Sequence, residues 1–450
     1  MAASRNISRR GVLRGASVIG LGGLVTGVAG CGTPLATGLA GTGPAKNTLA
    51  YWNLFGGGDG GRMVTMEQGY QKQHPDINLS AVTLQWGNPY YTKLSLATLG
   101  NQPPDLAISH LTRMTPLAEA GLLEPLDQAE LAPYGLTADN FTPAAWQKAH
   151  VNGTLYAIPL DTHPFVFYYN TDVCKKAGLL NPDGSLKSLD GPDAFTSALA
   201  AAQKVTGAYG AVVSINNDTA TQWRFFSTLY YQLGGKVLAD NGRAVVIDQA
   251  KAEQVLSFIQ NLTVKQKLMP PSIDYGGAQT TFATGKAAFY LEGDWEITTF
   301  QTTKTPSSMT AFPNVYGGTT AGYKVQADSH SFVLPRDAAR SPARRAEIFT
   351  FIRSMLDQSS TWAQGGHVPA WLPYQNSAAY TNLKPASDYR WVANHAVYDD
   401  PGWYAGSGSD FENITGFAIA AVSAGQQAPA VAVAEMHTKL TKYANTPSPV

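Results

Sequence analysis

GKAAFYLEGDW, residues 285–295, is the part of the chain that indicates most about its architecture. Its apolar residues alternate in the period-two pattern of a strand buried mainly on one side, and the strand is expected to end near Glu292. Gly293 interrupts the pattern, Asp294 is a good N-cap, and Trp295 can open a helix. Ligands of open α/β sheets bind beyond the carboxyl ends of strands, so this junction predicts a ligand site. The alternative is a capped turn that holds Trp295 in the core.

Earlier strands of the chain end in a similar way. Residues 48–53, 77–84 and 105–109 have strand patterns, and loops and helical stretches follow them. The polar and aromatic residues at these strand ends are Asp59, Trp86, Asn88 and His110. The glycines at 56–61 lack the Gly-Lys-Ser/Thr ending of a phosphate-binding loop, so close approach of the backbone to a neutral ligand is predicted instead.

Strands and helices alternate along the chain, which indicates an α/β protein. About 400 residues follow the N-terminal region, which is too many for one hydrophobic core and typical of two lobes. Strand patterns at 155–159 and 165–169 enclose Asp161 and His163, where we expect the chain to cross between lobes at a hinge. Residues 330–334 are expected to return to the first lobe as a buried strand.

The first thirty residues have the character of an export signal. Arg9 and Arg10 precede an apolar, Gly-rich run that is too short to span a bilayer, and no acid occurs before Cys31. The arginine pair resembles a twin-arginine signal, although the general secretory route stays open because Val12 departs from that pattern. Residues 28–31, VAGC, resemble a lipobox. We therefore expect lipidation of Cys31, followed by a flexible tether at residues 31–47.

Composition narrows the function classes. Removal of residues 1–30 takes away four Arg and no acid, which leaves 28 basic against 32 acidic side chains and a net charge of about −4. A mildly acidic chain without a basic block argues against nucleic-acid binding. The only other cysteine, Cys174, has no partner if Cys31 is lipidated, so no disulfide is expected. We expect neither a cofactor nor a metal ion.

A series of short motifs resembles the sugar-binding family (family 1) of extracellular solute-binding proteins, which are the receptors of ABC importers. The motifs are PDL at 104–106, GTLYAIP at 153–159, FYYNTD at 167–172, KKAGL at 175–179, GGK at 234–236, and GKAAF through GDW at 285–295. Their order and spacing carry the resemblance across roughly residues 48–360, and it weakens after about residue 365.

The resemblance implies a two-lobe periplasmic-binding-protein-like fold, with a mixed sheet flanked by helices in each lobe and a ligand cleft between them. It implies a signal peptide at 1–30, a first lobe from 48–161 plus 330–360, and a second lobe from 162–329 plus 361–450. The implied protein is a monomeric, non-enzymatic receptor. It is anchored at the extracellular face of the membrane through the Cys31 lipid and delivers a carbohydrate to the transmembrane subunits of a permease.

Sugar recognition requires hydrogen-bonding groups for hydroxyls and flat apolar faces for the C–H side of the ring. Trp295, Trp86 and Trp223 are the predicted stacking residues, in that order, with Trp371 beside His367 as a further candidate. The predicted polar contacts are Asp59, Asn88, His110, Asp161, His163, Glu292, Asp294 and His367. For any single His or Trp among them, packing in the core is the alternative.

Other function classes stay open. A receptor for a glycerophosphodiester would need an Arg or Lys cluster, for which only Arg62, Arg113 and Arg224 are candidates. A secreted glycosidase would use Glu292 and Asp294, which lie two residues apart on a strand at a spacing not unlike that of an inverting acid and base. A surface adhesin or scaffold would bind no small molecule.

Overall fold

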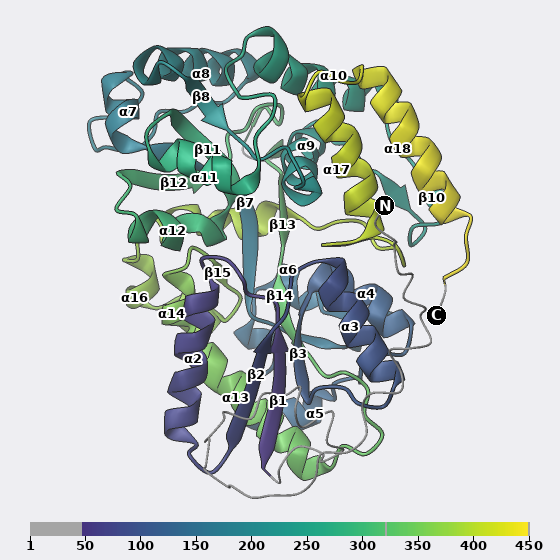
Figure 1. The fold of residues 1–450 in the computed structure, drawn as a ribbon. Helices are drawn as coiled ribbons and strands as arrows, with labels where there is room; N and C mark the ends of the chain where they lie inside the picture. Colours follow the sequence, from purple (N-terminus) through teal and green to yellow (C-terminus); the bar gives the residue numbers. More distant parts are fainter. Residues whose placement is uncertain (1–46, 320–321, 449–450) are drawn as a thin grey trace, which may run out of the picture. The chain divides into compact units, whose positions relative to one another are not determined.

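The computed structural model describes residues 47–319 and 322–448 of the 450-residue chain. The expected export signal, the lipidation site Cys31 and the tether up to residue 46 lie outside these residues. From Asn47 onward the chain forms one compact unit. Two β-sheets carry two separate clusters of buried apolar side chains in this unit, and the clusters define a first and a second lobe (Figure 1). No helix among the described residues is long and apolar enough to cross a membrane.

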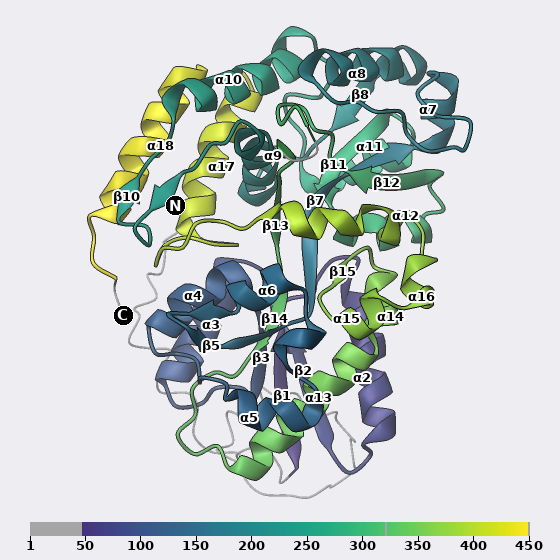
Figure 2. The same cartoon turned by 180° about the vertical axis from the view of Figure 1, so that it is seen from behind.

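The sheet of the first lobe has the strand order β2-β1-β3-β14-β6. β1 pairs in parallel with β2 and β3, whereas β14 is antiparallel to β3 and β6. The strands are β1 (Thr48–Asn53), β2 (Asn78–Thr83), β3 (Leu106–His110), β6 (Ala157–Pro159) and β14 (His330–Val333). α2 and α13 lie on one side of this sheet, and α3 and α4 on the other (Figures 1 and 2). The helices of this lobe are α2 (Gly60–Gln73), α3 (Asn88–Leu99), α4 (Leu111–Glu119), α5 (Gln128–Leu131), α6 (Pro143–Lys148), α13 (Pro342–Asp357) and α14 (Ser359–Ala363).

The sheet of the second lobe has the order β16-β13-β7-β11-β8, with β12 and β15 also paired to β7. Its strands are β7 (Asp161–Asn170), β8 (Tyr209–Val212), β11 (Ala287–Gly293), β12 (Ser307–Ala311), β13 (Val325–Asp328), β15 (Val368–Pro369) and β16 (Ala396–Val397). The main helices are α7 (Thr171–Lys176), α8 (Pro192–Thr206), α9 (Thr219–Gln232), α10 (Gln249–Gln260), α11 (Tyr275–Ala283), α12 (Ile297–Thr302), α17 (Asp410–Ser423) and α18 (Pro429–Ala444). α10, α17 and α18 gather beside α9 at one end of this sheet (Figure 1).

Shorter elements complete the chain. Two small sheets consist of β4 (His150–Val151) with β5 (Thr154–Leu155) and of β9 (Leu238–Ala239) with β10 (Ala244–Val245). α15 (Leu372–Gln375) and α16 (Ala378–Thr381) follow β15. Ala370 and Trp371 pack in the apolar cluster of the first lobe, although the chain on both sides of them continues into the second. The segment around β15 therefore contacts both lobes.

The chain passes between the lobes three times. β7 follows β6, Ser329 joins β13 to β14, and a loop joins α14 to β15. The chain crosses at Asp161 to His163 as an extended strand, because β7 begins at Asp161 and pairs there with β15 and β13. These backbone pairs satisfy the hydrogen-bonding groups of a buried segment, so extended structure continues through the crossing.

The junction at residues 285–295 agrees with expectation in part. β11 ends at Gly293, one residue after the expected end near Glu292, and the φ of −74° at Gly293 is one that any residue can adopt. Asp294 is not an N-cap, because its side chain makes no capping hydrogen bond and the residue lies inside a 3-10 turn, Asp294–Glu296. α12 begins only after this turn. The side chains of Asp294 and Glu296 are therefore not used to cap a helix.

Candidate functional site

A cavity of about 770 Å³ lies between the two lobes. From the first lobe, its wall includes Asp59 in the loop after β1, Trp86 in the loop after β2, and His110 at the end of β3. From the second lobe, the wall includes Arg224 of α9 and Trp295 after β11. Strand ends of both sheets thus meet at one concave site, which is where α/β sheets hold ligands.

The predicted residues divide into three groups by their relation to this cavity. Five line it, namely Asp59, Trp86, His110, His163 and Trp295. Four are completely buried and do not line it, namely Asp161, Glu292, Asp294 and His367. The remaining three, Asn88, Trp223 and Trp371, lie elsewhere.

The three residues away from the cavity have structural partners instead. Asn88 lies in the first turn of α3, where its side-chain amide donates a hydrogen bond to Asp410 at 3.3 Å. Trp223 is completely buried, and its indole N–H donates to Asp399 at 2.9 Å. Trp371 packs in the first-lobe cluster. Trp223 and Trp371 therefore pack in the core, which was the alternative to contact with a ligand.

Trp295 stands at the centre of the second-lobe wall. Its indole N–H donates to the hydroxyl of Tyr275 at 3.1 Å, and its ring meets His163 edge to face with centroids 5.7 Å apart. The six-membered part of the indole lies directly against Gly293, since a Cβ placed there would be 1.9 Å from a ring atom. The absence of a side chain at Gly293 thus allows this indole orientation.

Arg224 joins the aromatic residues of the two lobes. Its guanidinium carbon lies 5.6 Å from the ring centre of Trp86 and 5.0 Å from that of Trp295, within cation–π range of both. A nitrogen of the same group is 4.0 Å from a carboxylate oxygen of Glu412. Burial favours a lower pKa for Arg224, but Glu412 and Glu292 outweigh it and hold the pKa above the ordinary value. The cavity wall therefore carries a fixed positive charge between two indoles.

Carboxylates surround the second-lobe side of the cavity. Glu296 lines it and accepts hydrogen bonds from Tyr275 at 2.5 Å and Gln279 at 2.6 Å. Glu292 lies deeper, where it accepts from the hydroxyl of Thr221 at 2.9 Å. Burial raises the pKa of both carboxyls, that of Glu292 to about 8. Glu296 thus presents an ordered acceptor to the cavity, whereas Glu292 supports its wall.

Asp161 organises the floor of the cavity. Its carboxylate oxygens lie 3.0 Å from Nδ1 of His163 and 2.8 Å from Nδ1 of His330, and they accept the indole N–H of Trp362 at 2.7 Å. The rings of His163 and His330 stack with centroids 4.1 Å apart, and both residues line the cavity. Burial lowers the pKa of His163 to about 3, so its imidazole is neutral.

His367 and Asp294 lie beneath this floor. Nδ1 of His367 is 3.2 Å from an oxygen of Asp294 and 3.7 Å from an oxygen of Asp161. The imidazole stacks on Trp362 with centroids 4.4 Å apart. Burial raises the pKa of Asp294 to about 6. The floor therefore contains a dense group of imidazoles and carboxylates.

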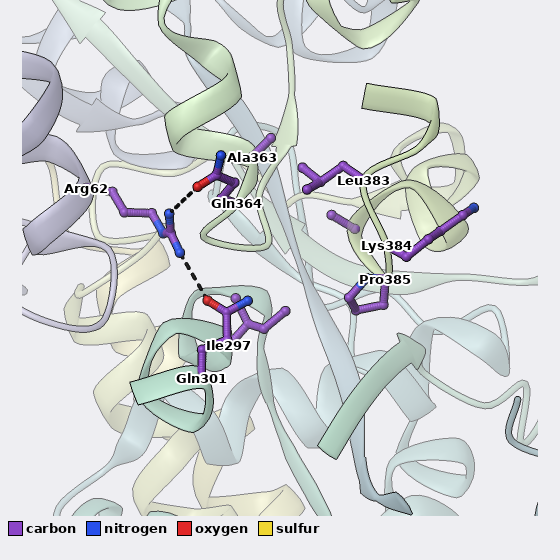
Figure 3. Close-up of a pocket in the computed structure, with 9 residues that line it drawn as sticks. Arg62, Ile297, Gln301, Ala363, Gln364, Leu383, Lys384 and Pro385 are labelled. Atoms are coloured by element: carbon purple, nitrogen blue, oxygen red, sulfur yellow. Dashed lines mark hydrogen bonds between the residues drawn. The ribbon is translucent and has the colours of Figure 1, made fainter. Parts of the chain in front are cut away.

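Arg62 links the lobes beside a small cavity of about 90 Å³. Figure 3 shows its guanidinium between Gln301 of α12 and Gln364 at the end of α14, with hydrogen bonds of 3.1 Å to each. A third bond, of 3.0 Å, reaches the hydroxyl of Thr298. Because Arg62 belongs to α2 of the first lobe and α12 to the second, these bonds connect the two lobes.

Several residues of the cavity wall were not predicted from the sequence as site residues for a sugar. Among them are Arg224, Tyr275, Gln279, Glu296 and His330. Arg224 directly follows Trp223, and because one residue rotates a helix by about 100°, the two side chains point to different faces of α9. The sequence offers no signal that selects between these faces, because α9 is buried along almost its whole length.

Comparison with known proteins gives a consistent result. Residues 57–360, more than half of the chain, match the profile of the bacterial extracellular solute-binding proteins. The arabinooligosaccharide-binding protein of Bacillus subtilis is 32% identical over 252 residues, which cover 54% of this chain and 52% of the relative. The maltotriose-binding protein of Pyrococcus abyssi is 24% identical over 241 residues, which cover 52% and 46%. The match spans about half the length of these curated relatives.

Crystal structures share the fold over nearly the whole described chain. The GacH receptor of Streptomyces glaucescens, studied unliganded and with acarbose, has a TM-score of 0.73 at 19% identity and covers 88% of this chain and 98% of its own. A solute-binding protein from Thermotoga lettingae bound with α-D-tagatose has a TM-score of 0.73 at 20% identity, covering 89% and 100%. At this identity the likeness shows the two-lobe fold alone.

Proposed function

This chain belongs to the family of bacterial extracellular solute-binding proteins, and we propose that it is the receptor component of an ABC importer for a carbohydrate. The ligand is an oligosaccharide or a glycoside, bound in the cavity of about 770 Å³. This volume lies within the roughly 300–1,000 Å³ of small-molecule sites in general. The relatives named for arabinooligosaccharide and maltotriose binding support the substrate class.

The observation that carries the proposal is the pairing of aromatic faces with hydrogen-bonding groups in one cavity. Trp86 and Trp295 come from different lobes and line the same space. The C–H face of a sugar ring packs well on an indole, and its hydroxyls need both donors and acceptors. Arg224 and Gln279 supply donors in the wall, and Glu296 supplies acceptors. This combination matches the amphipathic surface of a carbohydrate.

The same wall argues against a phosphorylated ligand such as a glycerophosphodiester. Of the three candidate arginines, only Arg224 lines the cavity, and a phosphate group would also meet the carboxylates of Asp59, Asp218 and Glu296. Repulsion from these carboxylates disfavours an anionic ligand. A neutral ligand avoids this cost.

Hydrolysis of the bound sugar is also disfavoured. Glu292 and Asp294 are completely buried, and neither lines the cavity. A general acid must lie within hydrogen-bonding reach of the atom that it protonates. We therefore propose that the protein binds its carbohydrate and releases it unchanged, and that it is not an enzyme.

We further propose that the lobes open and close around the ligand by rotation about the three passages of the chain. The proposed division places 48–161 plus 330–360 in the first lobe and 162–329 plus 361–450 in the second, although Trp362 and Trp371 pack in the first-lobe cluster. In the closed state the bonds of Arg62 to the second lobe are formed. A monomer in this state engages the transmembrane subunits of a permease, which release the sugar for transport.

Export and attachment to the membrane complete the proposal. The sequence VAGC at 28–31 supports cleavage before Cys31 and lipidation of that residue. A lipoprotein among the relatives, from Streptococcus pneumoniae, is 24% identical. The full chain is expected to fractionate with membranes, and Cys31→Ser is expected to move it to the medium. Equal membrane association of both forms would contradict the anchor.

A thermal-shift screen of the purified chain against sugars tests the ligand class. A ligand that binds only the native state adds about 2.7 kcal/mol of stability at a concentration 100 times its Kd. We expect arabino- or malto-oligosaccharides to raise the melting temperature and to be recovered intact after incubation. A shift with glycerophosphodiesters but with no carbohydrate would refute the sugar assignment, and turnover of the sugar would refute the receptor assignment.

A further inference from the structure

Half of the histidines of this protein gather around one carboxylate. The chain has eight histidines, and His110, His163, His330 and His367 all lie on or beneath the floor of the cavity. Four residues each offer one possible metal-ligand atom, and these atoms all lie within 4.8 Å of one another. The four are Asp161, His163, His330 and His367. All four side chains are buried. Recognition of a sugar does not account for His367, which is completely buried and does not line the cavity.

The imidazoles converge on Asp161 through the same ring atom. The distance from Nδ1 to a carboxylate oxygen of Asp161 is 3.0 Å for His163, 2.8 Å for His330 and 3.7 Å for His367. In a tetrahedral site with bonds of about 2.0–2.1 Å, the ligand atoms are roughly 3.3 Å apart. The distances from Asp161 to the three imidazoles are close to this value, whereas the four ligand atoms as a set lie within 4.8 Å of one another. Shifts on the order of 1 Å in side-chain position would complete the geometry.

Polar atoms with incomplete partners give a second sign. Within the described part of the chain, neither ring nitrogen of His367 and neither carboxylate oxygen of Asp294 makes a hydrogen bond of good geometry, although Nδ1 of His367 and an oxygen of Asp294 lie 3.2 Å apart. Both residues are completely buried. A buried polar group without a good hydrogen bond destabilises the fold, and a charged group does so more strongly. A bound cation would remove this cost, because it takes an imidazole as ligand and balances the carboxylates.

We propose that Asp161, His163, His330 and His367 bind a divalent transition-metal ion of the Zn²⁺ class. Three imidazoles and one carboxylate form a donor set that suits Zn²⁺, and the imidazoles disfavour Mg²⁺ and Ca²⁺, which prefer oxygen ligands. Asp294 lies 3.2 Å from the same Nδ1 of His367, so its carboxylate would help to balance the charge of an ion bound there.

The position of this site gives the ion a structural consequence. Its ligands come from all three passages between the lobes, since Asp161 and His163 start β7, His330 starts β14, and His367 precedes β15. A metal ion would tie these segments together at the hinge. His163 and His330 also line the cavity, so the ion would border the space for the ligand.

Titration of the full chain with the metal alone tests the site. The protein is treated with a chelator, dialysed, and titrated with Zn²⁺ by calorimetry and with Co²⁺ by visible absorption. We expect one saturable site per chain, the intense absorption of four-coordinate Co²⁺, and a rise in melting temperature with Zn²⁺. The alternative is that a proton on His367 balances the carboxylates, in which case no saturable site and no such spectrum appear, and the proposal is overturned.

Variants identify the ligands. His367→Gln and His163→Gln are each expected to weaken Zn²⁺ binding at least about tenfold. The matched control is His437→Gln, which changes an exposed histidine of α18 and should bind Zn²⁺ like the wild type. Equal affinity in all three variants would overturn the assignment. If a ligand variant does not fold, the Co²⁺ spectrum of the wild type decides alone. Sugar binding is measured separately, so failure of the metal site leaves the receptor function standing.

Discussion

Replacement of Gly293 by Ala tests how the cavity wall is built. The added Cβ would be 1.9, 2.0 and 2.4 Å from three ring atoms of Trp295, far inside van der Waals contact. The backbone of Gly293 is compatible with alanine, because its φ is −74°. The only route to relief is displacement of the indole by about 1.5 Å or more from Gly293, against its hydrogen bond to Tyr275.

The magnitude follows from the lost stacking. A displaced indole forfeits its contact with the sugar ring, and such contacts contribute about 0.5–1.5 kcal/mol beyond the area that they bury. With the area term we expect a loss of roughly 1–3 kcal/mol, or about 5- to 150-fold in Kd. Overpacking should also lower the free energy of unfolding by about 1–3 kcal/mol.

Calorimetric titration with the best sugar from the thermal-shift screen measures the effect. The matched control is Gly276→Ala in the first turn of α11, where a Cβ meets nothing within 4 Å. This variant should bind as the wild type does. Trp295→Ala should weaken binding by a similar 1–3 kcal/mol, and adding Gly293→Ala to it should weaken binding little further, because both changes act through the same ring. Wild-type affinity in Gly293→Ala, or full additivity in the double variant, would refute this reasoning.

Three further substitutions test the roles of Glu292, Trp223 and Arg62. Burial raises the pKa of Glu292 from 4.5 to about 8, so the folded protein keeps a proton that the unfolded chain loses, and stability falls as pH rises between these values. Glu292→Gln should therefore raise the free energy of unfolding by roughly 1–4 kcal/mol at pH 8 and little at pH 5, and equal effects in urea titrations at both pH values would contradict this. Trp223→Phe removes the hydrogen bond to Asp399 and should cost about 1–3 kcal/mol of stability without changing the Kd for sugar; weaker binding at unchanged stability would place Trp223 in the site after all. Arg62→Ala removes the bonds to the second lobe and should speed sugar release in stopped-flow measurements by about 3- to 30-fold, whereas an unchanged rate would show that closure does not depend on Arg62.

The alternation of strands and helices made the fold predictable. Period-two segments end at loops near Asp59, Trp86 and His110, and parallel strands align those ends at one edge of a sheet. The structure brings all three around the cavity. The details of the 285–295 junction were not predictable in the same way. Gly293 is the last residue of β11, as its position suggested, but it also accommodates the indole two residues later, and such a contact leaves no periodic signal.

The choice between neighbouring positions on a helix was beyond the sequence. Trp223 was the more attractive stacking residue by its chemistry, yet it is completely buried, and Arg224 faces the cavity. α9 is buried along almost its whole length, so its pattern of apolar residues does not reveal which face meets the core. Where both sides of a helix are covered, the amphipathic signal vanishes.

The histidine cluster depends on pairing between distant strands. The antiparallel register of β14 on β3 places His330 opposite His110, and the register of β13 on β7 places Asp328 opposite His163. In sequence, more than 160 residues separate Asp161 from His330, and 37 residues separate His330 from His367. No spacing rule for metal ligands covers such intervals, so the sequence predicted contacts with sugar hydroxyls and no metal.

The location of this cluster follows from the physics of a hinge. Segments that pass between two lobes belong to neither apolar core, and their polar groups must find partners at the crossing itself. Here the partners are side chains of the other passages, so one group of imidazoles and carboxylates contacts all three passages between the lobes. If the lobes rotate as proposed, an ion or proton held by this group would act on opening and closing to the extent that it interacts differently with the two states. Measuring sugar affinity with and without Zn²⁺ therefore tests whether metal binding at the floor is coupled to sugar binding in the cavity. By linkage, the sugar must change the affinity for Zn²⁺ by the same factor as Zn²⁺ changes the affinity for sugar.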